Sequence, residues 1–178
     1  MKRICVFCGS AQGRRDAYTN AAREVGRTLA AQGVGLVYGG AAIGTMGVVA
    51  DAALEAGGEV IGVIPESLQK KEVAHTGLTQ LHVVDSMHSR KALMTELSDA
   101  FLTLPGGYGT LDELFESLTW SQLGIHASPV GLWNVEGYFT PLLTMLDSMV
   151  TEGFLKPANR ERLLVEHTLG PLLERLLG

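Results

Sequence analysis

The segment Leu104–Glu113 holds the residues best suited to chemistry. It contains Leu-Pro-Gly-Gly-Tyr-Gly-Thr-Leu-Asp-Glu, follows an apolar run and precedes a helical pattern. Gly106, Gly107 and Gly109 leave the backbone bare, and a helix start supplies unpaired N–H donors with a partial positive charge. We therefore predict that this segment holds a phosphate, with the Glu113 carboxylate beside it. The segment lacks the lysine of a P-loop and the glycine spacing of a dinucleotide site, so it indicates neither an NTPase nor a dehydrogenase.

The string from Thr110 to Glu113 also has a structural explanation. It matches a capping box, in which the threonine hydroxyl caps the helix and the glutamate reaches back to the amide of the cap residue. That alternative accounts for the spacing without any catalysis. A carboxylate next to an anion site favours a catalytic base or a stabiliser of positive charge, and both interpretations stay open on the sequence alone.

Two more turns and one helix start can supply groups to the same site. Cys8-Gly-Ser10 ends the first predicted strand, and the loop from Tyr38 to Gly47 places four glycines before a helix. Those glycines either let a phosphate or sugar approach the backbone, or serve a tight turn and close helix packing. The string Met87-His-Ser-Arg-Lys91 begins another predicted helix. Its adjacent cations either form a solvated helix face or bind an anionic substrate.

Short β-branched runs alternate along the chain with longer stretches of helical period. The predicted strands are residues 4–8, 35–38, 60–64, 81–84, 100–104 and 130–133. The predicted helices are residues 17–32, 44–56, 86–98, 110–123, 138–151 and 169–177. Such alternation is typical of parallel strands joined by crossover helices. We predict an α/β fold: one domain over residues 1–178, a Rossmann-like three-layer sandwich with a mostly parallel sheet.

In such sheets ligands bind beyond the carboxyl ends of the strands, where loops lead into helix starts. The glycine-bearing turns all lie at such places in the predicted order of elements. The stretch 65–80 is the only long irregular segment, and we expect it to form a lid or a binding loop.

Composition narrows the classes of partner. The formal net charge of −5 excludes a global positive field for a nucleic acid. No apolar run approaches a membrane span, and too few apolar residues follow Met1-Lys-Arg3 for a signal peptide, so we expect a cytoplasmic protein with no membrane partner. Cys5 and Cys8 lie three residues apart on a predicted strand and point to opposite faces, which favours core packing in a reducing compartment over redox chemistry.

Together, the turn at Ser10, the loop from Gly39 to Gly47, the Arg90-Lys91 pair and the string from Pro105 to Glu113 resemble the Lonely Guy family of cytokinin riboside 5'-monophosphate phosphoribohydrolases. The resemblance covers most of the chain, and the combination of the last two motifs is highly specific. It implies a Rossmann-like homodimer that hydrolyses the N-glycosidic bond of AMP, or of its N6-prenylated relatives, to a free base and ribose 5-phosphate. It implies no cofactor and no metal.

The resemblance implies Arg90 and Glu113 as the catalytic pair. The substrate-binding residues that the motifs and the resemblance indicate are Ser10, Gly39, Gly40, Gly44, Glu72, Arg90, Lys91, Gly107, Tyr108, Gly109, Thr110, Leu111, Asp112, Glu113 and Thr119. Glu72 lies within the irregular segment, where its alternative role is a surface charge. One loop departs from the family pattern, because Ala41 follows Gly39-Gly40 where a third glycine is frequent and Thr45 replaces a leucine.

The alternatives to an enzyme are a nucleotide-binding or carrier protein without hydrolysis, and a site for another phosphorylated small molecule. Proteins of this kind have also been labelled lysine decarboxylases. That chemistry needs pyridoxal phosphate on a lysine Schiff base, and the sequence contains no recognisable site for it.

Overall fold

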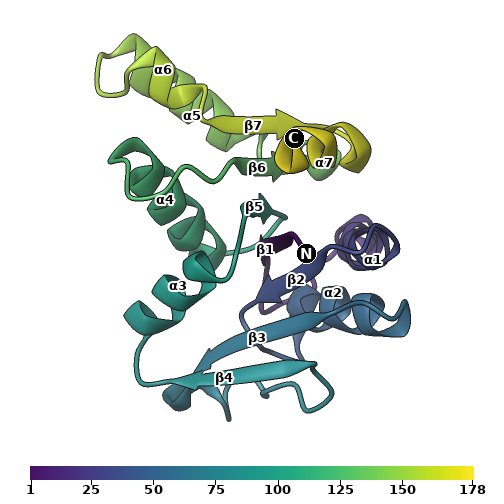
Figure 1. Ribbon diagram of the computed structural model, residues 1–178. Helices are drawn as coiled ribbons and strands as arrows, with labels where there is room; N and C mark the ends of the chain where they lie inside the picture. Colours follow the sequence, from purple (N-terminus) through teal and green to yellow (C-terminus); the bar gives the residue numbers. More distant parts are fainter.

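The computed structural model describes residues 1–178 as a sandwich around a seven-stranded sheet in which every neighbouring pair is parallel (Figure 1). The strand order is β4-β3-β2-β1-β5-β6-β7. The strands are β1 (Arg3–Phe7), β2 (Gly35–Tyr38), β3 (Val60–Pro65), β4 (Gln80–Val84), β5 (Ala100–Thr103), β6 (Val130–Trp133) and β7 (Leu163–Glu166). Strands β2, β3, β5 and β6 are buried along their whole length, because helices cover both faces of the sheet.

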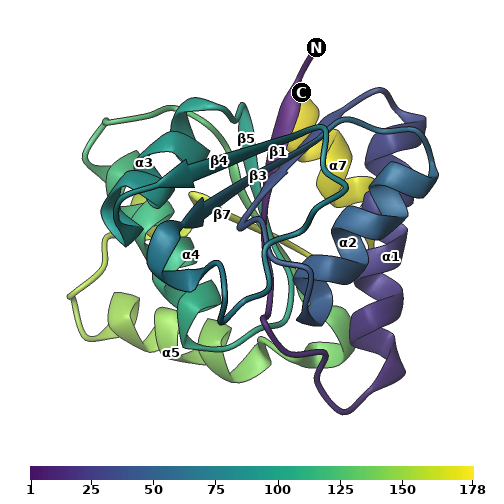
Figure 2. The same cartoon turned by 90° about the horizontal axis from the view of Figure 1, so that it is seen from below.

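Helices form the two outer layers (Figure 2). They are α1 (Asp16–Ala31), α2 (Gly44–Glu55), α3 (Met87–Glu96), α4 (Tyr108–Gln122), α5 (Thr140–Thr151), α6 (Pro157–Arg160) and α7 (Leu169–Leu177), with short 3-10 turns at Glu66–Leu68 and Val135–Gly137. Helices α1, α2 and α7 pack on one face of the sheet, and α3, α4 and α5 pack on the other. None of these helices combines the length and the apolar character that a membrane crossing requires.

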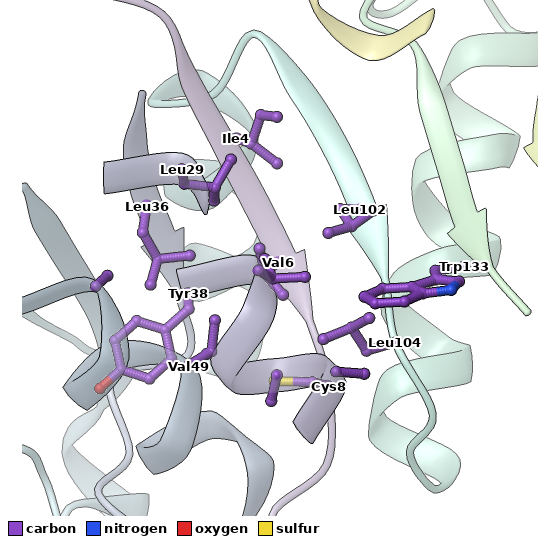
Figure 3. Packing of buried hydrophobic residues seen from close by; sticks show 14 of the residues in the cluster. Ile4, Val6, Cys8, Leu29, Leu36, Tyr38, Val49, Leu102, Leu104 and Trp133 are labelled. Carbon is purple, nitrogen blue, oxygen red and sulfur yellow. The ribbon is translucent and has the colours of Figure 1, made fainter. Parts of the chain in front are cut away.

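Strand β1 supplies side chains to both cores. Ile4 and Val6 pack with α1, α2 and α7, together with Cys8 just beyond the strand, as Figure 3 shows. Cys5 and Phe7 point the other way, into the core under α3, α4 and α5. The predicted opposite orientation of the two cysteines is therefore confirmed. Burial raises the pKa of the Cys8 thiol to about 12 and that of Cys5 well above its usual value, so both thiols stay protonated.

The predicted α/β sandwich is confirmed, and all six predicted strands form within about one residue of their expected bounds. Strand β7 and the short helix α6 were not predicted. β7 has only four residues at the edge of the sheet and is largely half-buried, so it lacks the long apolar run that marks the inner strands. Helix α4 begins at Tyr108, two residues before its predicted start at Thr110.

The chain order creates a switch point in the middle of the sheet. From β1 the chain builds outward through β2 and β3 to the edge strand β4, and then returns to place β5 on the other side of β1. Connections after β1 and after β5 therefore leave in opposite directions and open a crevice at the carboxyl ends of these strands. The segments that follow them are Cys8–Ser10 and Leu104–Thr110.

Candidate active site at the switch point

A pocket lies at this crevice and encloses about 530 Å³ of atom-free space, including open solvent at its mouth. Its position at a topological switch point is where small-molecule ligands bind in sheets of this kind. Its lining comes from the connections after β1, β3 and β5 and from the first turns of α2, α3 and α4. The lining residues are Cys8, Gly9, Ser10, Met46, Glu72, Met87, Arg90, Gly107, Tyr108, Gly109, Thr110 and Glu113.

The N-terminus of α4 brings a set of unpaired amides to this pocket. The backbone N–H groups of residues 107 to 110 make no hydrogen bond within the chain, and the first helical bond runs from the Leu111 N–H to the Gly107 carbonyl oxygen at 3.1 Å. All four residues line the pocket. Because the helix dipole adds partial positive charge at the same end, these amides are suited to bind an anion such as a phosphate.

The glycines of α4 are not required by the packing of the chain. A Cβ atom built on Gly107 or Gly109 meets no atom within 4 Å, and neither residue has a positive φ. A glycine inside the first turn of a helix costs up to about 1 kcal/mol relative to alanine. Room for a ligand against the backbone therefore explains Gly109 better than the fold does, whereas Gly107 is the N-cap of the helix, a position where glycine is also favoured.

The glycines of the loop after β2 have the opposite character. A Cβ on Gly44 would lie 2.3 Å from the backbone of Ser10, and one on Gly39 would lie 2.1 Å from the Arg90 guanidinium. Gly40 has a φ of +76° and packs on Ile64. None of the three lines the pocket. The structure therefore favours close packing over the predicted ligand contact for Gly39, Gly40 and Gly44.

The amides at the start of α2 are also occupied. The Met46 N–H donates to the Gly9 carbonyl oxygen at 3.2 Å, and the Thr45 N–H donates to that of Ala11 at 3.4 Å. Thr45, the residue that departs from the family pattern, also accepts a hydrogen bond from the Gly9 N–H through its buried hydroxyl at 2.9 Å. This loop consequently supports the connection after β1, and its bonded amides are not free for a ligand as those of α4 are.

The capping-box interpretation of Thr110 and Glu113 is wrong. The N-cap of α4 is Gly107, so Thr110 is the third residue of the helix and its buried side chain packs against Gly106. Glu113 lies in the second turn, and its carboxylate makes no hydrogen bond to the protein. The acid is thus free to act on a ligand in the pocket.

The environment of Glu113 makes its carboxyl group a weak acid. Burial raises its pKa from 4.5 to about 7, because little water reaches the charged form. Arg90 opposes this shift, whereas the negative charges of Asp112 and Glu72 add to it. A carboxyl group with a pKa near neutrality in a cleft is a recognised mark of an acid-base residue.

Arg90 is buried at the pocket wall and is held mainly by backbone oxygens. Its Nε donates to the Val63 carbonyl oxygen at 3.0 Å, and its Nη2 donates to that of Gly39 at 2.6 Å. Nη2 also lies 3.2 Å from a carboxylate oxygen of Glu72. Nη1 contacts only the Met87 sulfur, at 3.8 Å, so it is the nitrogen left to meet a ligand oxygen.

Several predicted substrate-binding residues lie outside the pocket lining. The Lys91 ammonium group pairs with Asp112 at 3.1 Å and with Glu116 at 2.9 Å, and so joins α3 to α4. Leu111 packs on the core under α4. Thr119 is exposed and lies about 14 Å along the helix from Thr110. Its hydroxyl donates to the Phe115 carbonyl oxygen at 2.7 Å. Direct substrate contact by these residues stays a prediction.

The structure brings Ser10, Glu72, Arg90, Glu113 and the residues 107–110 together, as the sequence analysis expected. It adds four lining residues that the analysis did not single out: Cys8, Gly9, Met46 and Met87. Each lies inside a motif that had been noted. The missing information was the strand order, because only the adjacency of β1 and β5 shows that the first turn faces the start of α4.

Known proteins are similar in sequence to this chain over nearly its whole length. A family model described as "possible lysine decarboxylase" matches residues 46–176. A cytokinin riboside 5'-monophosphate phosphoribohydrolase of Arabidopsis thaliana is 48% identical over 98% of this chain and 81% of its own length. One of Oryza sativa subsp. japonica is 49% identical over 98% of this chain and 72% of its own length.

Among solved structures, a molybdenum cofactor carrier protein of Chlamydomonas reinhardtii superposes with a TM-score of 0.72 over 99% of this chain and 98% of its own. Its sequence identity is 19%, so this likeness concerns the fold alone. The family model and the close relatives carry the assignment. By this similarity the chain belongs to the Lonely Guy family of cytokinin riboside 5'-monophosphate phosphoribohydrolases.

Proposed function

We propose that this protein is a hydrolase that cleaves the N-glycosidic bond of adenosine-type nucleoside 5'-monophosphates, giving a free base and ribose 5-phosphate. One observation carries the proposal: four unpaired amides of α4 and the unbonded Glu113 carboxylate line the same pocket. An anion site and an acid-base group one turn apart suit a substrate with a phosphate at one end of a sugar and a reactive carbon at the other. The names of the close relatives support this class of reaction.

Catalysis in this arrangement depends on position and charge. The amides of residues 107–110 bind the non-reacting 5'-phosphate and hold the ribose next to Glu113, so binding energy is used to orient the substrate. The bond between the anomeric carbon and the base nitrogen then breaks, with positive charge developing on the sugar. The Glu113 carboxylate stabilises that charge and accepts a proton from the attacking water, whose hydroxyl bonds to the anomeric carbon. The departing base takes up a proton from solvent and Glu113 then returns its proton to solvent, so that one water is consumed.

Arg90 completes the site from the opposite wall. Its Nη1 can donate to a phosphate or ribose oxygen, and its positive charge balances the carboxylates of Glu72 and Glu113. Because the rest of the guanidinium is fixed by the Val63 and Gly39 carbonyl oxygens, this donor is already oriented before substrate binds.

Two other activities fit the pocket less well. A lysine decarboxylase needs a lysine to hold pyridoxal phosphate, but no lysine lines the pocket and Lys91 is paired with two carboxylates. A carrier protein needs the anion site alone. It gives no reason for a half-buried carboxylate with a pKa of about 7 and no hydrogen-bond partner.

We further propose that the protein acts in the cytoplasm as a homodimer, on AMP or its N6-prenylated relatives. Its two cysteines are free and buried, which suits a reducing compartment. A surface groove between α4 and α5 is lined by apolar side chains that include Phe115, Leu146 and Met149, with Thr119 beside them. A second copy packed on this groove would cover these side chains and Thr119.

The reaction can be tested with matched substrates. Purified protein incubated with adenosine and prenyladenosine 5'-monophosphates should release free base, whereas the phosphate-free nucleosides should be cleaved at least roughly 100-fold more slowly, because they cannot use the amides of α4. Chromatography of the bases measures both rates. Equal cleavage of nucleoside and nucleotide would contradict the phosphate site, and binding without base release would favour the carrier.

Gly109→Ala tests whether the bare backbone serves the ligand. The added methyl group should lower affinity for AMP by roughly 10-fold or more while leaving the fold as stable or slightly more stable, since nothing in the chain lies near it. Calorimetric titration and thermal unfolding measure the two effects. Gly170→Ala is a matched control, because Gly170 is also the second residue of a helix, α7, with open space around its Cβ position. Unchanged affinity in Gly109→Ala would refute the site.

Glu113→Gln tests the catalytic carboxylate. The amide keeps the shape of the side chain but has no charge to stabilise the sugar cation, so turnover should fall by roughly 100-fold or more with nucleotide binding retained. In the wild type, kcat/KM should rise with pH through about 7, where the carboxyl group ionises. Near-normal turnover of the variant would reject the role of Glu113.

The raised pKa also predicts how stability depends on pH. The folded protein holds the Glu113 proton until about pH 7, whereas the unfolded chain releases it near 4.5. The free energy of unfolding should therefore fall by about 3 kcal/mol as pH rises from about 4.5 to about 7, and this contribution then stays constant. Glu113→Gln lacks this titration. Urea unfolding of both proteins across the window should show the stability of the wild type falling relative to that of the variant, and a constant difference between them would contradict the shift.

A further inference from the structure

The irregular segment between β3 and β4 carries Glu72 and is tied to the loop after β2 by its backbone. The Ala42 N–H donates to the Val73 carbonyl oxygen at 2.7 Å, and the His75 N–H donates to that of Gly40 at 2.9 Å. Val73 has a φ of +51°, in the left-handed region that β-branched residues rarely adopt. Such a conformation is strained and persists only where neighbouring contacts enforce it.

The His75 side chain supplies one of those contacts. Its Nε2 lies 2.8 Å from a carboxylate oxygen of Asp51 on α2, and its Nδ1 accepts a hydrogen bond from the Gly77 N–H at 3.0 Å. One tautomer satisfies both contacts, with the hydrogen on Nε2 donated to Asp51. The His75 side chain is 12% exposed and that of Asp51 is 60% exposed, so the imidazole is enclosed while its partner lies at the surface.

Three residues before His75, the same segment presents Glu72 to the active site. The Glu72 carboxylate lies 3.2 Å from Arg90 Nη2, the nitrogen that also donates to the Gly39 carbonyl oxygen. A shift of the segment would withdraw this negative charge and loosen the guanidinium at the pocket wall. Asp51 on α2 thus contacts His75, the backbone joins His75 to Glu72, and Glu72 contacts Arg90.

We propose that His75 is a positioning residue of this site: its bond to Asp51 anchors the segment 69–77 to α2 and so holds Glu72 against Arg90. The role rests on the proposed function, because it concerns how the site is held for base release. The His75 side chain makes no hydrogen bond to a residue that lines the pocket, so its effect on the reaction is transmitted by the segment.

Substitution of the two partners tests the bond. His75→Ala and Asp51→Ala should each lower kcat/KM for AMP by roughly 10-fold, because small misplacements of a positioning group have effects of this order or larger. The double variant should lose no more than either single variant, since both remove the same bond. Asp51→Asn keeps an oxygen acceptor and should retain most of the activity. His167→Ala removes an exposed histidine with no side-chain hydrogen bond and serves as the control.

A second background separates positioning from general damage. In Glu72→Gln, where the charge that His75 holds in place is already absent, adding His75→Ala should change kcat/KM by less than about 2-fold. Wild-type rates in His75→Ala would overturn the proposal. So would losses that multiply in the double variant with Asp51→Ala, or an undiminished loss in the Glu72→Gln background.

Hydrogen exchange measures the anchor without catalysis. The amides of Ala42, Ala74 and His75 should exchange faster in His75→Ala and in Asp51→Ala than in the wild type, with the rest of the sheet unchanged. Unchanged exchange would overturn the anchor even if activity fell. If the wild type releases no base, the proposed function fails, and the exchange rates still decide whether His75 holds the segment.

Discussion

A buried guanidinium group holds the site together. Arg90 lies at the start of α3 and donates to carbonyl oxygens at the ends of β2 and β3, far apart in sequence. Burying this charge is unfavourable unless its donors are satisfied, and the two carbonyl oxygens with the Glu72 carboxylate satisfy two of its three nitrogens. The third faces the pocket. The fold therefore uses most of the hydrogen-bonding capacity of Arg90 to orient the part that remains for substrate.

The two glycine-rich loops have similar compositions but different structural roles. In the loop after β2, Gly39 and Gly44 bring backbones into contact, and the amides that follow are bonded to the connection after β1. At the start of α4, Gly107 and Gly109 face open space and the amides are unpaired. Close packing requires glycine at the first two positions, whereas the open space at the second two leaves the backbone accessible to a ligand. One loop builds the support and the other presents the binding surface.

Glu113 is placed where stability and function conflict. Its carboxylate has no hydrogen-bond donor from the protein, and burial makes its ionisation unfavourable near neutral pH. A lysine or backbone amide in contact would stabilise the charge and lower the pKa, but it would also occupy the oxygens that a ribose or water must approach. Lys91 lies next to Arg90 in the sequence, but its ammonium group is paired with Asp112 and Glu116 and so joins α3 to α4.

The sequence by itself determined the class of fold, six of the strands and the core of the site, because these follow from local signals. Alternating apolar runs identify a parallel sheet, and Leu104–Glu113 identifies an anion site with a carboxylate beside it. Local pattern could not decide between a capping box and a catalytic base or charge stabiliser at Glu113, since both give the same spacing. Tertiary structure excluded the capping box by starting α4 at Tyr108. Cys8, Met46 and Glu72 meet at one pocket only because β1 lies beside β5 and because the segment before β4 folds back toward the site. Local sequence does not reveal this, because strand order is set by long-range packing.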